Sequence, residues 1–99
     1  MSQISVVATI TAKAGRADDI IAAFDGAKHA VQGETGTLQY VLHRSQANPD
    51  LLFVTELYAD QAALDAHMSG AAIAALGGIG DAIESFDMQF ATPVSVAKA

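Results

Sequence analysis

The residues best suited to chemistry gather in one stretch, residues 53–70, which reads FVTELYADQAALDAHMSG. Glu56, Tyr58 and His67 lie close together in it. An imidazole changes its charge near neutral pH and can take a proton from a phenol. A carboxylate can orient that imidazole, and a tyrosine hydroxyl can donate a hydrogen bond to a substrate oxygen. These three residue types therefore fit proton abstraction from a small acidic substrate.

A strand followed by a helix is expected to position the three side chains. Residues 51–59 are strongly apolar, and Glu56 and Tyr58 have the same strand parity, so they share a face of the sheet. Asp60 can cap a helix that runs through Ala63, Leu64, His67 and Met68. His67 falls on the apolar side of that helix and should point toward the sheet.

Each of the three residues also has an ordinary structural explanation. His67 would then be a core histidine, hydrogen-bonded to a carbonyl group or to Glu56. Glu56 would bond a helix terminus, or Arg44 of a second subunit, because a buried carboxylate needs a partner. Tyr58 would end its strand with its hydroxyl in water. In the catalytic interpretation, Glu56 orients His67 and Tyr58 donates to the substrate.

The surrounding pattern predicts an α+β fold. Residues 3–13 alternate as a strand, and 14–33 have helical spacing of apolar residues. Two strands at 37–45 and 51–59 are joined by the turn residues Asn48, Pro49 and Asp50. A helix follows Asp60, with Ser69-Gly70 as a candidate break, and a second helical pattern runs from Ala72 to Phe86 with a kink or short loop expected at its glycines. Residues 87–96 are expected to be the last strand, which lies at a sheet edge or ends early because of Pro93.

The order is β-α-β-β-α-β, the split βαβ or ferredoxin-like arrangement, with a four-stranded antiparallel sheet and both helices on one face. We expect residues 1–99 to form a single domain. Residues 51–58 carry large apolar side chains of both parities, and the helices can cover one face of the sheet. The other face would expose an apolar patch, and such patches mark interfaces. The sequence therefore predicts a homodimer with sheet packed against sheet.

Charge and composition exclude several classes of function. With 5 Lys and Arg against 11 Asp and Glu, the chain has a net charge of −6, which disfavours nucleic acids and anionic membranes. The absence of Cys removes disulfides, thiol nucleophiles and thiolate metal sites. No signal peptide or apolar membrane-spanning segment is recognised, so a cytoplasmic location is expected.

The segment 33–70 resembles the antibiotic biosynthesis monooxygenase domain of the dimeric α+β barrel group. The likeness rests on a Gly before a Tyr-x-Leu strand, an Asn-Pro turn, a strand ending in Glu-x-aromatic, and an Ala-Leu-x-x-His helix. The matching positions are Gly36, Tyr40, Leu42, Asn48, Pro49, Phe53, Glu56, Tyr58, Leu64 and His67. The resemblance implies a dimer and a ligand cavity between the helices and the sheet of each subunit.

The same resemblance implies oxygenation of an electron-rich aromatic, such as a quinol or a polyketide-type phenol, by molecular oxygen without a flavin, haem or metal. His67 is then the expected base, supported by Tyr58 and Glu56. Haem degradation is disfavoured, because that branch relies on an Asn and a Trp, and this chain has no Trp. The alternative is a dimer of the same fold that binds a small ligand without catalysis, in a stress or accessory role. The residues expected to bind the substrate are Phe24, Tyr40, Val54, Leu64 and Met68.

The remaining polar residues give weaker signals. Arg44 shares its strand parity with Tyr40 and could clamp a ligand, although a solvated cation on an edge strand is the simpler interpretation. His43 and His29 are expected at the surface. The three histidines lack His-x-x-His and His-x-x-x-His spacing, so no metal site is predicted.

Overall fold

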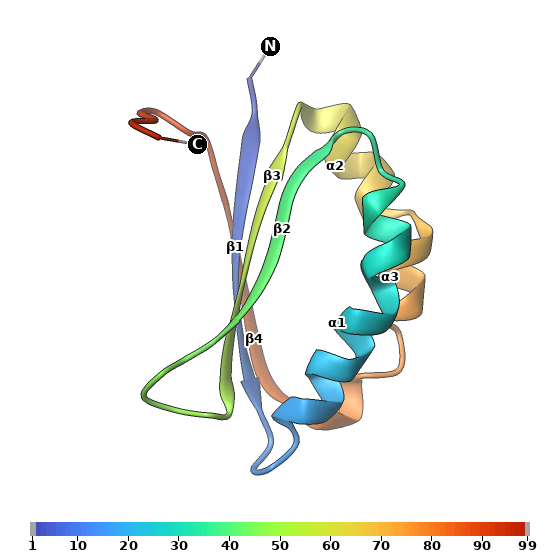
Figure 1. Ribbon diagram of the computed structural model, residues 1–99, viewed down its shortest axis with the longest axis vertical. Helices are drawn as coiled ribbons and strands as arrows, with labels where there is room; N and C mark the ends of the chain where they lie inside the picture. The colour runs from blue at the N-terminus through green and yellow to red at the C-terminus, as the bar shows by residue number, and fades with distance from the viewer. Residues whose placement is uncertain (1, 99) are drawn as a thin grey trace.

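The protein consists of a four-stranded antiparallel sheet with helices on one face (Figure 1). The computed structural model describes residues 2–98. In spatial order the strands are β2 (Thr37–Arg44), β3 (Leu51–Tyr58), β1 (Ile4–Ala12) and β4 (Ile83–Ala91). The helices are α1 (Ala17–Gln32), α2 (Gln61–Met68) and the short α3 (Ala71–Ala75), and one 3-10 turn, η1 (Gly80–Ala82), precedes β4. This arrangement confirms the ferredoxin-like fold.

The core lies between the sheet and the helices. Alternate residues of β1 and β3 point toward the helices, and Val6, Ala8, Ile10, Leu52 and Val54 are buried there. Helix α1 contributes buried residues at helical spacing, Ile20, Phe24 and Ala27. Burying these apolar faces against one another is the main force that holds the two layers together.

The connections follow from local hydrogen bonding. Gly15 has a positive φ of 75° in the turn between β1 and α1, a conformation that glycine adopts without strain. In the β2–β3 loop the Ser45 hydroxyl oxygen accepts from the backbone N–H groups of Ala47 and Asn48, both at 3.1 Å, and the Asn48 side chain accepts from the Asp50 N–H at 3.0 Å. Asp60 caps α2 by accepting from the Ala63 N–H at 2.9 Å, as predicted.

The prediction was wrong at the end of the second helical region. The helical pattern was expected to run to Phe86 with a kink or short loop at its glycines. The break does fall there, since α3 ends at Ala75 before Gly77, but the residues beyond it do not resume a helix, and Phe86 belongs to β4. The glycines that follow α3 weaken a helix, and the residues beyond them gain ladder hydrogen bonds with β1, where Ala12 faces Ile83 and Ile10 faces Phe86. The last strand is therefore 83–91 instead of 87–96. Pro93 lies beyond its end, and β4 is an edge strand as predicted.

The opposite face of the sheet carries no helix (Figure 1). The strand register shows which side chains lie on this face, because residues that face each other across the ladder point to the same side of the sheet. Phe53 pairs with Thr9 and His43, and Thr55 pairs with Val7 and Val41. Val7 and Val41 are exposed, while Leu51, Phe53 and Leu57 are half-buried among their neighbours on the sheet. A face that carries apolar side chains, interspersed with Thr9, His43 and Thr55, is thus open to solvent in one chain.

Candidate active site

His67 lies at the centre of a polar cluster between the helices and one end of the sheet. The imidazole projects from α2 toward the sheet and is 1% exposed, which confirms its predicted direction. Its ring contacts two tyrosine rings, with centroid distances of 5.2 Å to Tyr40 on β2 and 5.3 Å to Tyr58 on β3. Three elements therefore converge on this histidine.

Glu34 is the carboxylate that bonds this imidazole. The distance from His67 Nδ1 to Glu34 Oε1 is 2.7 Å. The same Glu34 oxygen accepts a hydrogen bond from the Thr37 hydroxyl at 2.8 Å. Glu34 precedes β2 in the loop that follows α1, and its side chain is 18% exposed. Glu34 lies 33 positions before His67 and was not among the predicted site residues.

Glu56 makes a different contact from the one expected. It shares the helix-facing side of β3 with Tyr58, as predicted, and both side chains are buried. The Tyr58 hydroxyl donates a hydrogen bond to Glu56 Oε1. The structure therefore contains two pairs, His67 with Glu34 and Tyr58 with Glu56, and the expected bond from Glu56 to His67 is not made.

Burial controls the ionisation of this cluster. Burial raises the pKa of Glu56, and the charge of Glu34 acts in the same direction, while the Tyr58 hydrogen bond and the positive charge of His67 oppose the shift. Burial likewise raises the pKa of Tyr58, with further contributions from its bond to Glu56 and from nearby charges. Burial, followed by the charges of Glu56 and Glu34, raises the pKa of Tyr40. Both tyrosines are therefore neutral hydrogen-bond donors at physiological pH.

Two grooves border the cluster without including His67, Tyr58 or Glu56. The first, of about 510 Å³, lies between α1 and β2, and Phe24 and Tyr40 are part of its wall. Their rings are stacked with centroids 6.2 Å apart. The second, of about 520 Å³, lies between α2 and β4 and is lined by Leu64, Met68 and Phe90 among others.

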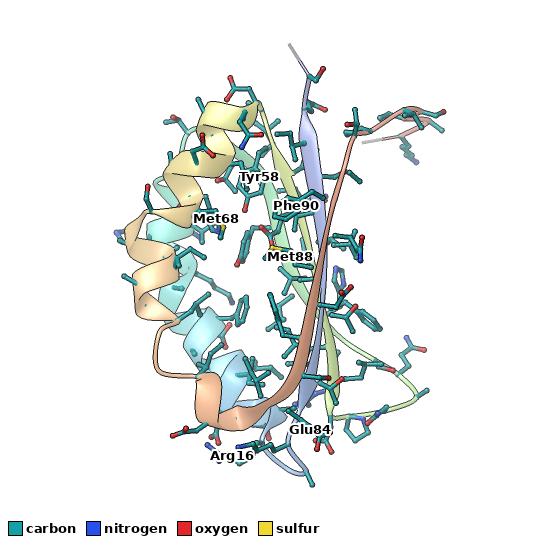
Figure 2. All side chains as sticks on the ribbon, turned by 180° about the vertical axis from the view of Figure 1, so that it is seen from behind. Arg16, Tyr58, Met68, Glu84, Met88 and Phe90 are labelled. Atoms are coloured by element: carbon teal, nitrogen blue, oxygen red, sulfur yellow. The ribbon has the colours of Figure 1, made fainter. Side chains whose placement is uncertain are left out.

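The five residues expected to bind substrate are thus divided between these grooves and the core. Phe24 and Tyr40 line the first groove, and Leu64 and Met68 line the second. Val54 is buried in the core with Leu52. Figure 2 shows Met68 on α2 and Met88 and Phe90 on β4 reaching into the space between the helices and the sheet, with Tyr58 nearby.

The other polar candidates lie at the surface. Arg44 is exposed on the edge strand β2 and forms an ion pair with Asp18 of α1, and His43 is exposed and bonds the Thr55 hydroxyl. His29 is also exposed. Among residues 2–98, no group of three or more His, Cys, Asp or Glu side chains is arranged to hold a metal ion. Within the same residues, no helix is long and apolar enough to cross a membrane.

Comparisons with known proteins agree with this architecture. The structure is similar to the crystal structure of protein SO0527 from Shewanella oneidensis, with 28% identity, a TM-score of 0.85, and 93% of this chain and 91% of that chain covered. It is also similar to "a putative antibiotic biosynthesis monooxygenase" from Caulobacter crescentus CB15, with 28% identity, a TM-score of 0.86, and 95% and 92% covered. Rv0793 from Mycobacterium tuberculosis shares the fold at 20% identity, with a TM-score of 0.87 and 98% and 100% covered.

A comparison of the sequence with protein families covers most of the residues of the site. No curated protein matches the sequence significantly. The family model described as antibiotic biosynthesis monooxygenase matches residues 3–76, a range that contains Glu34, Tyr40, Glu56, Tyr58 and His67. Because this match covers more than half of the chain, the protein belongs to the antibiotic biosynthesis monooxygenase family.

Proposed function

We propose that this protein is a cofactor-independent monooxygenase that oxidises a small electron-rich aromatic, of the quinol or polyketide-phenol type, with molecular oxygen. His67 is the base. The observation that carries the proposal is the buried imidazole, bonded to a carboxylate and in contact with two tyrosine rings, within the region matched by the family model. A buried, oriented histidine is suited to removing a proton from a phenol or from an activated ring carbon.

The reaction requires no reductant other than the substrate. His67 takes a proton from the substrate, and the resulting anion gives electrons to oxygen, so that a C–O bond forms and a hydroperoxide results. The O–O bond then breaks, one oxygen atom leaves in water, and the other stays on the substrate. For an activated ring CH₂ group the net change is R₂CH₂ + O₂ → R₂C=O + H₂O, in which the carbon is oxidised and oxygen is reduced.

The α1–β2 groove supports an aromatic substrate. Phe24 and Tyr40 present stacked rings in its wall, and aromatic rings favour offset-stacked or edge-to-face partners. Tyr40 also contacts the His67 ring, so it connects the groove to the base. Its raised pKa keeps its hydroxyl protonated, so it can donate a hydrogen bond to a substrate oxygen.

Oxygen uptake across a panel of quinols and anthrones tests the function. We expect turnover by the wild-type protein, and a loss of about 100-fold or more in kcat for His67→Ala, the range typical of removing a general base. His29→Ala is the matched control, because His29 is an exposed histidine on α1 outside the cluster. Undiminished turnover by His67→Ala would remove His67 from the mechanism.

A second candidate function is binding of a small hydrophobic ligand without turnover. The burial of His67 favours it, because the imidazole is 1% exposed and borders neither groove. Calorimetric titration with the same aromatic panel separates the two functions. Binding without oxygen uptake by any compound supports this candidate, whereas uptake that depends on His67 supports the enzyme.

We also propose that the helix-free face of the sheet packs against a second copy of the chain. Val7, Val41 and Phe53 lie there with Leu51 and Leu57, interspersed with Thr9, Thr55 and His43, and exposed apolar side chains gathered on one face mark interfaces. Sedimentation at micromolar concentration should give about twice the 10.2 kDa of one chain. A mass near 10.2 kDa would contradict the homodimer.

A further inference from the structure

We propose that Glu34 is a positioning residue, which holds the proton of His67 on Nδ1 and so leaves Nε2 as the atom that accepts the substrate proton. This inference rests on the proposed function for its catalytic consequence. Its structural part, the location of the proton on the imidazole, can be measured independently of any reaction.

The direction of the bond between the two side chains follows from their chemistry. At 2.7 Å, His67 Nδ1 and Glu34 Oε1 are within normal hydrogen-bond distance. An ionised carboxylate has no hydrogen to donate, so the hydrogen in this bond must be on Nδ1. In a neutral imidazole one nitrogen carries the hydrogen and the other has the free lone pair. Nε2 is then the basic nitrogen.

The loop that carries Glu34 is held in place by several contacts. The Glu34 N–H donates to the Val31 carbonyl at 3.0 Å, and the Thr37 N–H donates to the Glu34 carbonyl at 3.2 Å. The Thr37 hydroxyl donates to Glu34 Oε1 at 2.8 Å, so the carboxylate oxygen that bonds His67 is fixed from a second side. These bonds restrain both the backbone and the side chain of Glu34.

A close approach of the same loop to α2 sets the distance between the pair. A Cβ atom added to Gly36 would overlap the Cβ of Ala63 and lie 3.3 Å from its Cα, so glycine lets the loop lie directly on the first turn of α2. The Gly36 carbonyl also accepts from the Ala59 N–H at 2.9 Å. The loop is therefore attached to the β3–α2 junction at Ala59 and packs on Ala63, which lies one turn of helix before His67.

The other groups around His67 leave Glu34 as its carboxylate partner. From β3, Glu56 accepts the hydrogen bond of Tyr58, and from β2, Tyr40 contributes its neutral ring. Glu34 and Glu56 are the carboxylates of the cluster, and both stabilise a positive imidazole when they are ionised. Glu34 is the one in direct contact with the ring, so its removal should have the larger effect on the orientation and tautomer of the imidazole.

Histidine ¹⁵N NMR tests the tautomer directly. We expect the neutral His67 side chain of the wild-type protein to carry its proton on Nδ1, with the exposed His29 as an internal reference. In Glu34→Gln the amide can donate to Nδ1 as well as accept from it, so we expect the Nε2-protonated form to become populated. Thr37→Val keeps the carboxylate and should keep the Nδ1 proton.

Kinetic measurements test the catalytic role of Glu34 with any substrate that the wild-type protein oxidises. Glu34→Gln should lower kcat by about tenfold or more and change KM by less than about twofold, since Glu34 acts through His67. Glu84→Gln, an exposed change on β4 that removes the same charge, is the control and should leave both quantities unchanged.

The two proposals fail in distinguishable ways. An Nε2-protonated His67 in the wild-type protein would overturn the role of Glu34, whatever the activity. An Nδ1 proton that persists in Glu34→Gln would also overturn it. An Nδ1-protonated His67 that shifts in Glu34→Gln, in a protein that oxygenates no compound of the panel, would support the positioning contact and contradict the proposed monooxygenase activity.

Discussion

Glu56 illustrates how a single buried carboxyl group can couple stability to pH. Its pKa in the folded protein lies above the usual value of 4.5, mainly because burial disfavours the charged form. Between the unfolded and the folded pKa values the folded state binds more protons. The free energy of unfolding therefore falls as pH rises through that window and is highest, for this group, below 4.5.

The replacement Glu56→Gln should remove this pH dependence. The Gln side-chain oxygen can still accept from the Tyr58 hydroxyl, but it carries no charge to bury. We expect the stability of the variant relative to wild type to increase as pH rises from about 4.5 and to level off above the folded pKa. Urea unfolding of both proteins from pH 4 to pH 8 measures this difference.

The exposed variant Glu84→Gln controls for the loss of one negative charge at the surface. A Glu56→Gln curve that runs parallel to wild type over the whole range would contradict the assignment of a raised pKa to Glu56.

At the scale of elements, the contact between the α1–β2 loop and α2 brings the two halves of the site together. Glu34 and Tyr40 belong to the first half, and His67 belongs to the second. Gly36 lies at the point of contact, against Ala63. The site therefore depends on a glycine that takes no part in the chemistry.

The replacement Gly36→Ala should destabilise the protein by about 1–3 kcal/mol, the usual cost of inserting a methyl group into a packed contact. Gly26→Ala is the matched control, because Gly26 lies inside α1 and a Cβ added there would meet nothing outside the helix within 4 Å. This replacement should stabilise the protein by about 0.5–1 kcal/mol, since alanine favours a helix more than glycine does. Opposite changes in the free energy of unfolding are expected. Equal effects of the two replacements would show that Gly36 is not a tight contact.

For the whole molecule, the arrangement in one layer of helices and one of strands leaves half of the sheet surface without cover (Figure 1). Phe53 lies on that face in a central strand, between Thr9 and His43 of the neighbouring strands. A carboxylate at its position would have to lose its water in the proposed dimer, which is costly.

The replacement Phe53→Asp should therefore shift the protein toward the monomer by at least tenfold in the dissociation constant, as measured by sedimentation equilibrium. A cost of about 1.4 kcal/mol is enough for that change. Asp87→Asn, on the same face but on the edge strand β4, changes charge without introducing a buried one and serves as the control. A Phe53→Asp protein that associates as tightly as wild type would contradict the proposed interface.

Local patterns in the sequence determined the elements and the faces of most side chains. Alternation placed Glu56 and Tyr58 together on the buried side of β3, and helical spacing turned His67 inward. Asp60 identified the start of α2, and Asn48-Pro49-Asp50 identified the turn before β3. These features depend on residues that are only a few positions apart in the sequence, so the sequence alone is sufficient to predict them.

Contacts between distant segments were decided by the tertiary structure. Residues 83–86 pair with β1 about 70 positions away, which is why they form a strand in spite of their helical spacing. Likewise, His67 bonds Glu34 and not Glu56, although Glu56 is nearer in the sequence. The α1–β2 loop packs on α2 and brings Glu34 to the imidazole, while Glu56 accepts the hydrogen bond of the Tyr58 hydroxyl. Local spacing determines the side of an element on which a residue lies, whereas its partner is determined by packing.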